Sequence, residues 1–479
     1  MINIEEKLVQ LAQEYTKTSC IAINKIPQSG SNRQYFRLLF RDNPSLIAVY
    51  NGDVRENRAF FYYTDFFSNN NINVPQIFHI DESKKYYLLE DLGDETLFSY
   101  LTKHHNPENE NLEADIFKFY EKTVKMLPRI QNLGRQNLNF HYAYPRDAFD
   151  NQSMMWDLNY FKYYFLKLIN LFFDEQELEN DFQSFINFLL GAESDFFLFR
   201  DFQSRNIMLK NDDVYFIDYQ GGRRGALQYD LASLLYDGKA NLSNSDREKL
   251  FAIYLDEAEK VLSIERQNFI RYFDGFVLIR ILQALGAYGY RGYFERKSHF
   301  LLSIPYALKN LSFLLENSKN LPDIPLLREL LVALIQSPIF PSLSKRNILT
   351  VTITSFSYKK GIPQDFSANG GGFVFDCRAL PNPGREKRYA NATGKDISVI
   401  DYLEKYSEVA QFKERTFALV ESSVNNYLER KFTNLMVNFG CTGGQHRSVY
   451  FAEQLQKYLK EKYSNRIHIE LKHTNLPNQ

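Results

Sequence analysis

Two acidic residues and an asparagine have a spacing that could support phosphate transfer. Asp201 and Asn206 follow the apolar run 197–199, and Asp218 ends a second apolar run at 214–217. Transfer from ATP needs a carboxylate for the proton of the attacking hydroxyl, and further oxygen ligands for magnesium. We therefore predict that Asp201 is the base or hydroxyl-orienting group, and that Asn206 and Asp218 bind magnesium through oxygen.

These residues also have a simpler explanation. Asp and Asn are frequent in turns because their side chains bond to the local backbone, and Asp218 could end a strand by chance. An isolated Asp-x-x-x-x-Asn pattern would therefore be weak evidence. A second Asp at the expected distance, with strand-like runs on both sides, favours the phosphotransfer interpretation.

Two earlier segments are typical of a nucleotide site. A polar turn between the strand-like runs 21–26 and 34–40 could place backbone N–H groups over phosphates. Its central residues are Ser29, Gly30, Ser31 and Asn32. The strand-like run that ends at Glu90 predicts a hinge between two lobes, where adenine would bond to the backbone between Glu90 and Leu92. An ordinary hairpin and a helix cap are the alternatives for these segments.

The phosphate-pairing lysine of protein kinases is missing from its usual place. That lysine ends the third strand, but the run 46–50 ends in Tyr50. Arg55 and Arg58 begin the next predicted helix and could supply the charge. A solvated helix face is the simpler interpretation of both.

Helical spacing of apolar residues dominates much of 111–190 and 246–317. Asp157 on one such helix could reach a sugar, although we expect it at the surface. Asp230 is expected to cap a helix that follows a loop in the place of a kinase activation segment. These patterns predict an α+β bilobal protein-kinase-like fold for residues 1–335.

Composition restricts the class of protein. A chain of 479 residues suggests two or three domains. With 57 basic and 58 acidic side chains, net charge gives no overall attraction to nucleic acid or membranes. The widely spaced Cys20, Cys377 and Cys441 fit a reducing cytoplasm. Because neither a signal-peptide pattern nor a long apolar run occurs, we expect a cytoplasmic protein without a membrane partner.

The sequence changes character after the segment 336–347, in which two prolines predict a linker. Residues 348–479 alternate strand-like and helical runs, which predicts a small α/β domain. The expected strands are 349–356, 373–378 and 435–439, and the expected helices are about 397–405, 407–430 and 447–462.

A glycine-rich loop joins the last expected strand to the last helix. Its candidate anion-binding residues are Cys441, Thr442, Gly443, Gly444, His446 and Arg447. Glycines permit close backbone approach, and a helix N-terminus favours negative charge. A plain strand-to-helix turn with a packed cysteine is the simpler alternative. Cys441 and Arg447 also have the spacing of the phosphate cradle in tyrosine-phosphatase-like enzymes, in which a thiolate attacks phosphorus.

Several motifs of residues 5–335 resemble the aminoglycoside-phosphotransferase-like kinases. The motifs are Ser29 to Arg37, Leu88 to Gly93, Arg200 to Asn206 and Phe216 to Leu235. The sequence looks most like the bacterial cell-wall sugar kinases that phosphorylate N-acetylmuramate and N-acetylglucosamine at the anomeric hydroxyl. This resemblance implies ATP and magnesium as cofactors. Phe199 and Gln203 replace histidines that are usual in the family, and Gly-Gly-Arg-Arg follows Gln220 in place of Asp-Ala, which leaves the acceptor sugar open.

Residues 348–479 are similar to the C-terminal domain of RapZ, the RNase adapter. The shared motifs are Ser355 to Pro363, Phe375 to Pro383, Thr393 to Asp396 and Gly440 to Ser448. That domain binds a small RNA and senses glucosamine-6-phosphate, so the resemblance implies Thr442, Gly443, His446 and Arg447 at a phosphate. Gln445 replaces a common lysine, which weakens the inference of RNA binding.

Three functions remain open from the sequence. The first is an ATP-dependent amino-sugar kinase fused to a regulatory domain that binds a phosphorylated sugar. The second is an RNA-binding regulatory adapter whose kinase half is degenerate, as Tyr50 and Phe199 would suggest. The third is a phosphatase that uses Cys441 and Arg447. Retention of Asp201, Asn206 and Asp218 favours the first.

Overall fold

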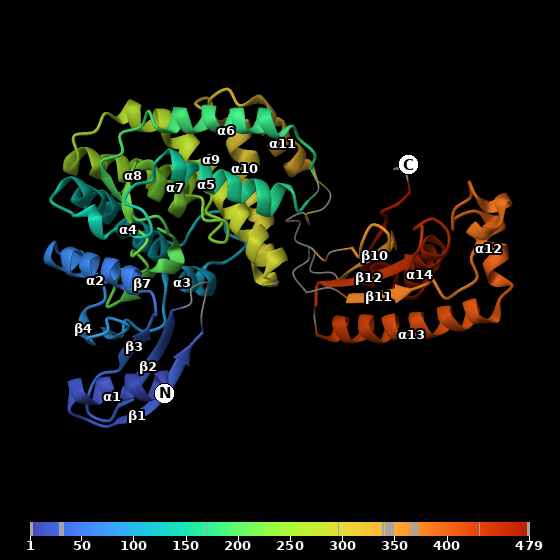
Figure 1. The fold of residues 1–479 in the computed structure, drawn as a ribbon, viewed down its shortest axis with the longest axis horizontal. Helices are drawn as coiled ribbons and strands as arrows, with labels where there is room; N and C mark the ends of the chain where they lie inside the picture. Colours follow the sequence, from blue (N-terminus) through green and yellow to red (C-terminus); the bar gives the residue numbers. More distant parts are fainter. Residues whose placement is uncertain are drawn as a thin grey trace. The chain divides into compact units, whose positions relative to one another are not determined.

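The computed structural model describes residues 3–27, 33–169, 171–295, 297–337, 340, 349–363, 365, 372–430 and 432–476. The chain divides into two compact units, which are Met1–Ala287 with Tyr306–Gln336, and Tyr288–Pro305 with Ser337–Gln479 (Figure 1). The second unit thus includes Tyr288–Pro305, a segment from the middle of the chain. Most of the predicted linker 336–347 lies outside the described residues, and the domain boundaries at 335 and 348 remain predictions.

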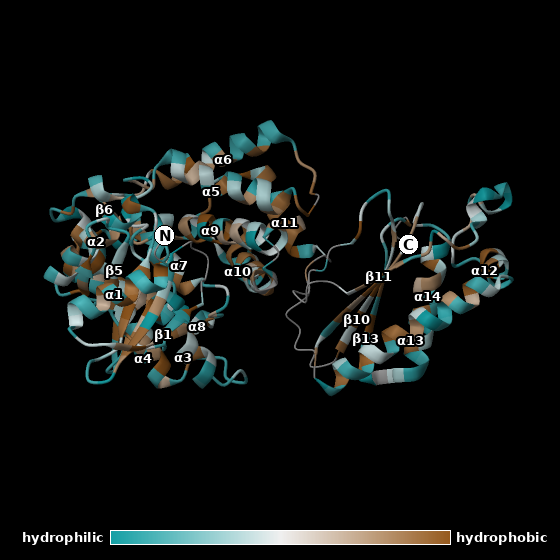
Figure 2. Ribbon diagram, turned by 60° about the horizontal axis from the view of Figure 1, so that its bottom comes forward, coloured by the Kyte–Doolittle hydropathy of each residue, from teal (hydrophilic) through white to brown (hydrophobic). Residues whose placement is uncertain are grey.

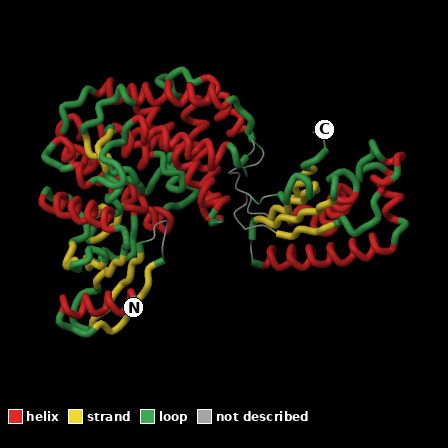
Figure 3. Tube along the Cα trace, viewed as in Figure 1, coloured by secondary structure: helices red, strands yellow, loops and turns green. Residues whose placement is uncertain are grey.

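The first unit begins with a five-stranded antiparallel sheet, drawn in yellow near the N-terminus in Figure 3. Its order is β1-β2-β3-β5-β4, with β1 Cys20–Ile26, β2 Gln34–Phe40, β3 Leu46–Tyr50, β4 Ile77–Ile80 and β5 Tyr86–Glu90. Alternation along the strands divides their side chains between two faces. Phe36 and Ala48 pack with helix α1 (Ile4–Thr16) on one face. On the other face, Tyr87 contacts Phe60 of helix α2 (Val54–Asn69), with ring centroids 5.6 Å apart.

The remainder of the first unit is mainly helical, as the red tubes of Figure 3 show. Its helices are α3 Leu97–His104, α4 Ala114–Asn132, α5 Asn151–Phe161, α6 Glu175–Leu189, α7 Gln228–Leu235, α8 Asn244–Val261, α9 Arg266–Gly289, α10 Ile304–Asn317 and α11 Pro325–Gln336. Two short antiparallel ribbons pair β6 (Phe196–Leu198) with β9 (Arg223–Gly225), and β7 (Ile207–Lys210) with β8 (Asp213–Phe216). A small sheet followed by a helical part confirms the predicted α+β, protein-kinase-like fold.

The second unit contains a four-stranded parallel sheet in the order β11-β12-β10-β13. The strands are β10 Leu349–Ser357, β11 Gly372–Asp376, β12 Asn434–Cys441 and β13 Ile467–His473, and the helices are α12 Ile397–Glu404, α13 Ser407–Glu429 and α14 Arg447–Tyr463. The strands of this sheet are largely brown in the hydropathy colouring of Figure 2. Val351 and Val437 of the sheet share a buried core with Val420 of α13 and Leu455 of α14. The predicted α/β domain is confirmed, although the sequence analysis missed β13.

Within the part of the chain that the structure describes, every helix is too short or too polar to cross a membrane.

Candidate functional sites

The three predicted phosphotransfer residues lie together between the two short ribbons. Asp201 follows β6, Asn206 immediately precedes β7, and Asp218 follows β8. The Asn206 amide nitrogen donates to the backbone oxygen of Asp201 at 2.8 Å and to Oδ2 of Asp218 at 3.3 Å. Pairing of β7 with β8 therefore joins residues that are well separated in sequence.

The oxygens of this cluster fit a hard cation. No described residue donates a hydrogen bond to the Asp201 carboxylate. Asp218 keeps exposed surface, yet crowding by protein atoms and then the charge of Asp201 raise the pKa of Asp218. Gln220 donates to Asp218 at 2.8 Å, while its own buried Oε1 has no described partner. Such excess negative charge and open oxygens suit magnesium, which takes few protein ligands and completes its shell with phosphate oxygens and water.

No cluster of three or more His, Cys, Asp and Glu side chains forms a metal site among the described residues. Two oxygens of this cluster, from the Asp218 carboxylate and the Asn206 amide, would hold the magnesium that the sequence predicts. This assignment stays a prediction.

The backbone before Asp201 is held in an unusual conformation by a buried carboxylate. Arg200 has a φ of +83°, a left-handed value that is uncommon for residues other than glycine. The N–H groups of Phe199 and Arg200 donate to the two carboxylate oxygens of Asp230, at 2.6 and 3.0 Å. The expectation that Asp230 caps a helix is wrong, because α7 begins at Gln228 and Asp230 lies within its first turn, fully buried. Its carboxylate holds the turn before Asp201 instead.

Asp157 is not at the surface, contrary to the expectation from sequence. Only 7% of its surface is exposed, and both of its carboxylate oxygens accept from the Arg200 guanidinium, at 2.8 and 2.6 Å. The same guanidinium lies 4.9 Å from the ring centroid of Phe149 and 5.1 Å from that of Tyr229. Burial opposes the charge, but Asp157 raises the pKa of Arg200. The Asp157 carboxylate thus holds the residue before Asp201.

The acidic side chains of the predicted hinge accept hydrogen bonds from other side chains of the first unit. Glu90 accepts from Lys210 at 2.7 Å, and Asp91 accepts from Arg37 and Ser45, each at 2.7 Å. Thr96 is the N-cap of α3, so the acids are not a helix cap. Leu92 is buried, and the backbone contacts of adenine at Glu90 and Leu92 remain a prediction.

The predicted phosphate-binding turn cannot be placed in the same way. Ser29, Gly30, Ser31 and Asn32 lie outside the described residues, so their role also stays a prediction.

Arg33, the first described residue after this turn, forms an ion pair that the sequence analysis missed. Arg33 Nη2 lies 3.3 Å from Oε1 of Glu56 on α2, and the Arg33 guanidinium lies 5.5 Å from the Phe60 ring centroid. Only 3% of the Arg33 surface is exposed. Counting the strand alternation of β2 back to Arg33 could have placed it on the α2 face. Arg55 and Arg58, the candidates from sequence, are both exposed on α2.

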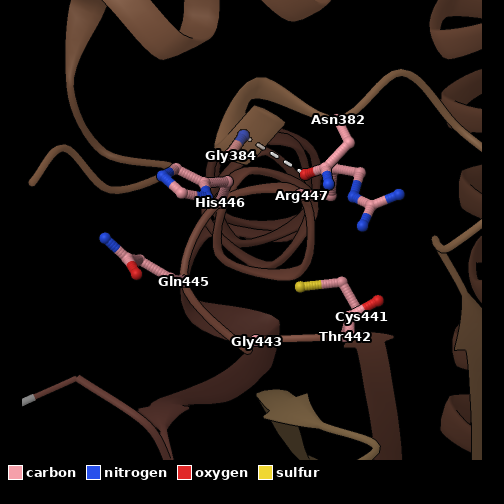
Figure 4. A pocket seen from close by; sticks show the side chains of 8 residues that line it. All are labelled: Asn382, Gly384, Cys441, Thr442, Gly443, Gln445, His446 and Arg447. Carbon is pink, nitrogen blue, oxygen red and sulfur yellow. Dashed lines mark hydrogen bonds between the residues drawn. The ribbon is translucent and has the colours of Figure 1, made fainter. Parts of the chain in front are cut away.

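A pocket of about 190 Å³ opens where β12 ends and α14 begins. It is lined by Asn382, Gly384, Cys441, Thr442, Gly443, Gln445, His446 and Arg447. Figure 4 shows the Cys441 sulfur pointing into the space between the side chains of His446 and Arg447. All the predicted anion-binding residues except Gly444 therefore line one cavity. Gly444 shapes the loop, because its φ is +69° and a Cβ there would lie 2.7 Å from the Asn475 side chain.

The Cys441 thiol has several hydrogen-bond donors around it. The Gly444 N–H donates to Sγ at 3.2 Å, and the Ser448 hydroxyl lies 3.1 Å from it. Burial would raise the pKa of Cys441, but the hydrogen bonds of Ser448 and Gly444 and the charge of Arg447 lower it below the usual thiol range. By contrast, burial and the neighbouring Cys441 raise the pKa of Cys377.

The longer side chains of this loop are anchored to carbonyl groups. Arg447 Nη1 donates to the backbone oxygens of Arg378 and Leu380 at 2.8 and 2.9 Å, whereas its buried Nε has no described partner. His446 Nε2 lies 2.9 Å from the Tyr389 oxygen. Gln445, in the place of a common lysine, donates to the backbone at Ala390 and Ala392, so this position offers neither charge nor a free amide nitrogen.

Comparison with known proteins identifies relatives of both units. Residues 22–263 match the model of the phosphotransferase enzyme family, and residues 349–477 match that of the RapZ C-terminal domain. A "Nucleotide-binding protein" of Aliivibrio salmonicida is 42% identical over 113 residues, which cover 24% of this chain and 38% of that protein. Another, of Xylella fastidiosa, is 33% identical over 184 residues, which cover 34% of this chain and 56% of the relative. The chain thus spans about half or less of the length of these relatives.

Among solved structures, the gentamicin complex of APH(2")-IIa has 15% identity and a TM-score of 0.45, covering 66% of this chain and 98% of that one. Choline kinase LicA from Streptococcus pneumoniae has 14% identity and a TM-score of 0.43, covering 65% and 100%. The family match begins within β1, extends through α8, and includes Asp201, Asn206 and Asp218. The chain therefore belongs to the phosphotransferase enzyme family and carries a RapZ C-terminal domain after its kinase-like part.

Proposed function

We propose that this chain is an ATP- and magnesium-dependent kinase of a small molecule, with the hydroxyl of an amino sugar as acceptor. The convergence of Asp201, Asn206 and Asp218 from two loops is the observation that carries this proposal. A degenerate kinase would have no need of an unhindered Asp201 carboxylate beside an amide and a second carboxylate. The family match to residues 22–263 supports the same reaction class.

Each residue of this cluster has its own role in the proposed phosphate transfer. Asp201 orients the acceptor hydroxyl and takes up its proton, since its carboxylate is free of described donors. Asn206 and Asp218 would hold magnesium through their oxygens. Magnesium supplies charge neutralisation on the transferred phosphate. Asp230 and Asp157 keep the turn before Asp201 in place.

The amino sugar is proposed from the resemblance to cell-wall sugar kinases, and the structure bears on one departure from it. Phe199, where those kinases carry a histidine, is 1% exposed and packs against Phe202 at 5.2 Å and Tyr219 at 6.0 Å between ring centroids. A core position contributes no contact to an acceptor. The replaced histidine at Phe199 therefore weighs little against a sugar substrate.

We propose that the pocket at Cys441 to Arg447 binds the phosphate of a phosphorylated sugar and regulates the kinase. A glycine-shaped loop, a helix N-terminus and the Arg447 guanidinium favour an anion there. The match of residues 349–477 to the RapZ C-terminal domain supports the same class of ligand.

Phosphorus NMR tests the kinase directly. Purified protein is incubated with ATP, magnesium and a panel of amino sugars, with the Asp201→Asn variant as control. We expect a new sugar-phosphate resonance that the variant does not produce. ATP binding without transfer to any sugar hydroxyl would contradict the proposed reaction.

A second candidate function is an RNA-binding regulatory adapter, which the RapZ C-terminal match favours. The anchored Gln445 speaks against it, because a lysine at this position would add a charge for RNA phosphates. Filter binding of a structured RNA at increasing salt separates the two functions. Tight binding that weakens steeply with salt would support the adapter, since each phosphate contact releases counterions.

A further inference from the structure

The end of β3, where kinases usually carry a cation for the nucleotide phosphates, is occupied by Tyr50 in this chain. Tyr50 packs against Tyr86, with ring centroids 4.9 Å apart. Both tyrosines pack against the hydrophobic core that α1 forms with this face of the sheet. Tyr50 therefore lies on the face of the sheet opposite to α2, and no charge reaches the α2 side from this position.

Strand alternation places Arg33 on the α2 side. Gln34 pairs with Tyr50 across β2 and β3, and such cross-strand partners share a face. Arg33 precedes Gln34 by one residue and so lies on the opposite face, together with Tyr35. The hydrogen bond from Arg33 Nη1 to the Tyr35 hydroxyl, at 3.3 Å, agrees with this placement.

The contacts of Arg33 hold its guanidinium in a fixed position. Glu56 of α2 lies 3.3 Å away, as its counter-ion, and the Phe60 ring lies beneath the guanidinium. Burial opposes the charge, but Tyr35, Tyr87 and Glu56 raise the pKa of Arg33, so it stays protonated.

We propose that Arg33 binds a phosphate of the nucleotide and takes the place of the missing β3 lysine, with Glu56 holding its guanidinium in position. This inference rests on the proposed kinase function and names the residue that recognises the nucleoside polyphosphate. A guanidinium suits the task because its fixed fork of N–H donors can bind two phosphate oxygens while it remains bonded to a carboxylate. The charge that kinases usually carry at the end of β3 then lies just before β2 in this chain.

A purely structural Arg33 is the alternative, since the pair with Glu56 also fastens α2 to the sheet. The two roles differ in what they do to nucleotide recognition. A phosphate ligand affects ATP and leaves adenosine unchanged, because adenosine has no phosphate. A structural residue affects both through the shape of the cleft, or neither.

Isothermal titration calorimetry with ATP and magnesium, and separately with adenosine, distinguishes the two roles. We expect Arg33→Met to weaken ATP binding about 10- to 100-fold, as for loss of a charge-assisted contact. Adenosine binding should stay within about twofold of the wild type. Arg41→Met is the matched control, since Arg41 is exposed just after β2 and should leave both affinities unchanged.

Two further variants keep the test decisive if Arg33→Met folds poorly. Arg33→Lys keeps the charge and loses the fork, so it should retain an intermediate preference for ATP over adenosine. Glu56→Gln keeps the Arg33 guanidinium but removes the charge that positions it, so it should reduce this preference less than Arg33→Met or Arg33→Lys. ATP binding that is unchanged in both Arg33 variants, or ATP and adenosine lost in equal proportion, would overturn the proposal.

Failure of this inference and failure of the kinase give different results. If wild-type protein binds ATP better than adenosine and the preference disappears with Arg33, the inference holds even when no sugar is phosphorylated. If sugar is phosphorylated and the Arg33 variants bind ATP normally, the kinase stands and the inference is wrong.

Discussion

The two candidate sites of this chain present opposite chemistry at a similar place in their folds. The candidate phosphotransfer site brings together oxygens of Asp201, Asn206 and Asp218, which suit a cation. The C-terminal loop brings the Arg447 guanidinium and the start of α14 to one pocket, and these groups suit an anion. Each site includes a loop that follows a buried strand, β6 or β12, so the side chains that follow the strand, and not the strand itself, decide the sign of the ligand.

The two loops also reach left-handed backbone values in different ways. The catalytic loop has Arg200 at φ +83° and Asp218 at φ +69°, and the Asp230 carboxylate holds the N–H of Arg200. The C-terminal loop uses Gly444 at φ +69°, which needs no such support. Conformation in the first loop therefore depends on a tertiary contact, whereas in the second it is local. The catalytic loop should be the more sensitive of the two to distant substitutions.

The largest expected effect is at the cation-binding loop. Asp218→Asn removes a charge that we assign to magnesium and keeps a side chain that tolerates positive φ. We expect phosphate transfer to fall by at least about 100-fold, because a metal ion contributes several kcal/mol to charge stabilisation. A magnesium titration of transfer activity measures this, with Asp65→Asn on the exposed side of α2 as control. Equal activity in Asp218→Asn and wild type would remove Asp218 from the magnesium site.

The next effect concerns the tertiary support of that loop. Asp230→Ala leaves two buried N–H groups without their acceptor. We expect the free energy of unfolding to fall by about 2–4 kcal/mol in urea titrations. Asp65→Ala should change it by less than about 0.5 kcal/mol. A stable Asp230→Ala protein with full transfer activity would show that the catalytic turn keeps its shape without this contact.

A smaller effect is expected at the anion-binding loop. Arg447→Met should weaken binding of glucosamine-6-phosphate roughly tenfold, because one charge-assisted contact is lost. Calorimetry measures it, and Arg415→Met, an exposed position on α13, is the control. The substitution also removes the hydrogen bonds of Arg447 to the backbone of Arg378 and Leu380. A melting curve of the variant must therefore show that it is folded. Unchanged affinity in folded Arg447→Met would place the phosphate elsewhere.

The smallest effect is a difference in reactivity between two cysteines. The lowered pKa of Cys441 gives it more thiolate than an ordinary thiol at the same pH, whereas the raised pKa of Cys377 gives it less. Alkylation by iodoacetamide, followed by mass spectrometry, should modify Cys441 at lower pH than Cys377. Sugar phosphate should protect Cys441 if it occupies the same pocket. Hydrolysis of an aryl phosphate that Cys441→Ser abolishes would instead support the phosphatase alternative.

The same shift of Cys441 has a consequence for stability. Its folded pKa is below that of the unfolded thiol, so the folded protein binds fewer protons through the intervening pH range. The contribution of Cys441 to stability should thus be present above the unfolded pKa and lost as pH falls through the folded pKa. Comparing Cys441→Ser with wild type in urea at several pH values measures this contribution.

Local patterns were sufficient for most strands and for the core of the catalytic site. The runs at 34–40 and 46–50 coincide with β2 and β3, and Asp201, Asn206 and Asp218 meet as predicted. The missed strand β13 alternates apolar and polar residues from Ile467 to His473, so the signal was present. Failures at Asp157, Asp230 and Arg33 have another origin. Each of these side chains is explained by a partner more than twenty residues away, such as Arg200 for Asp157.

The sequence by itself determined the two families, the α+β and α/β character of the two parts, and the residue types at both candidate sites. Those features follow from periodicity and from short motifs, which act within a few residues. Only the tertiary structure decided that Arg33 pairs with Glu56, that Asp230 holds the turn before Asp201, and that Gln445 is bound to carbonyl groups. A buried charge or donor is stable only with a partner, and the fold can supply that partner from a distant part of the chain. The local sequence pattern therefore does not identify it.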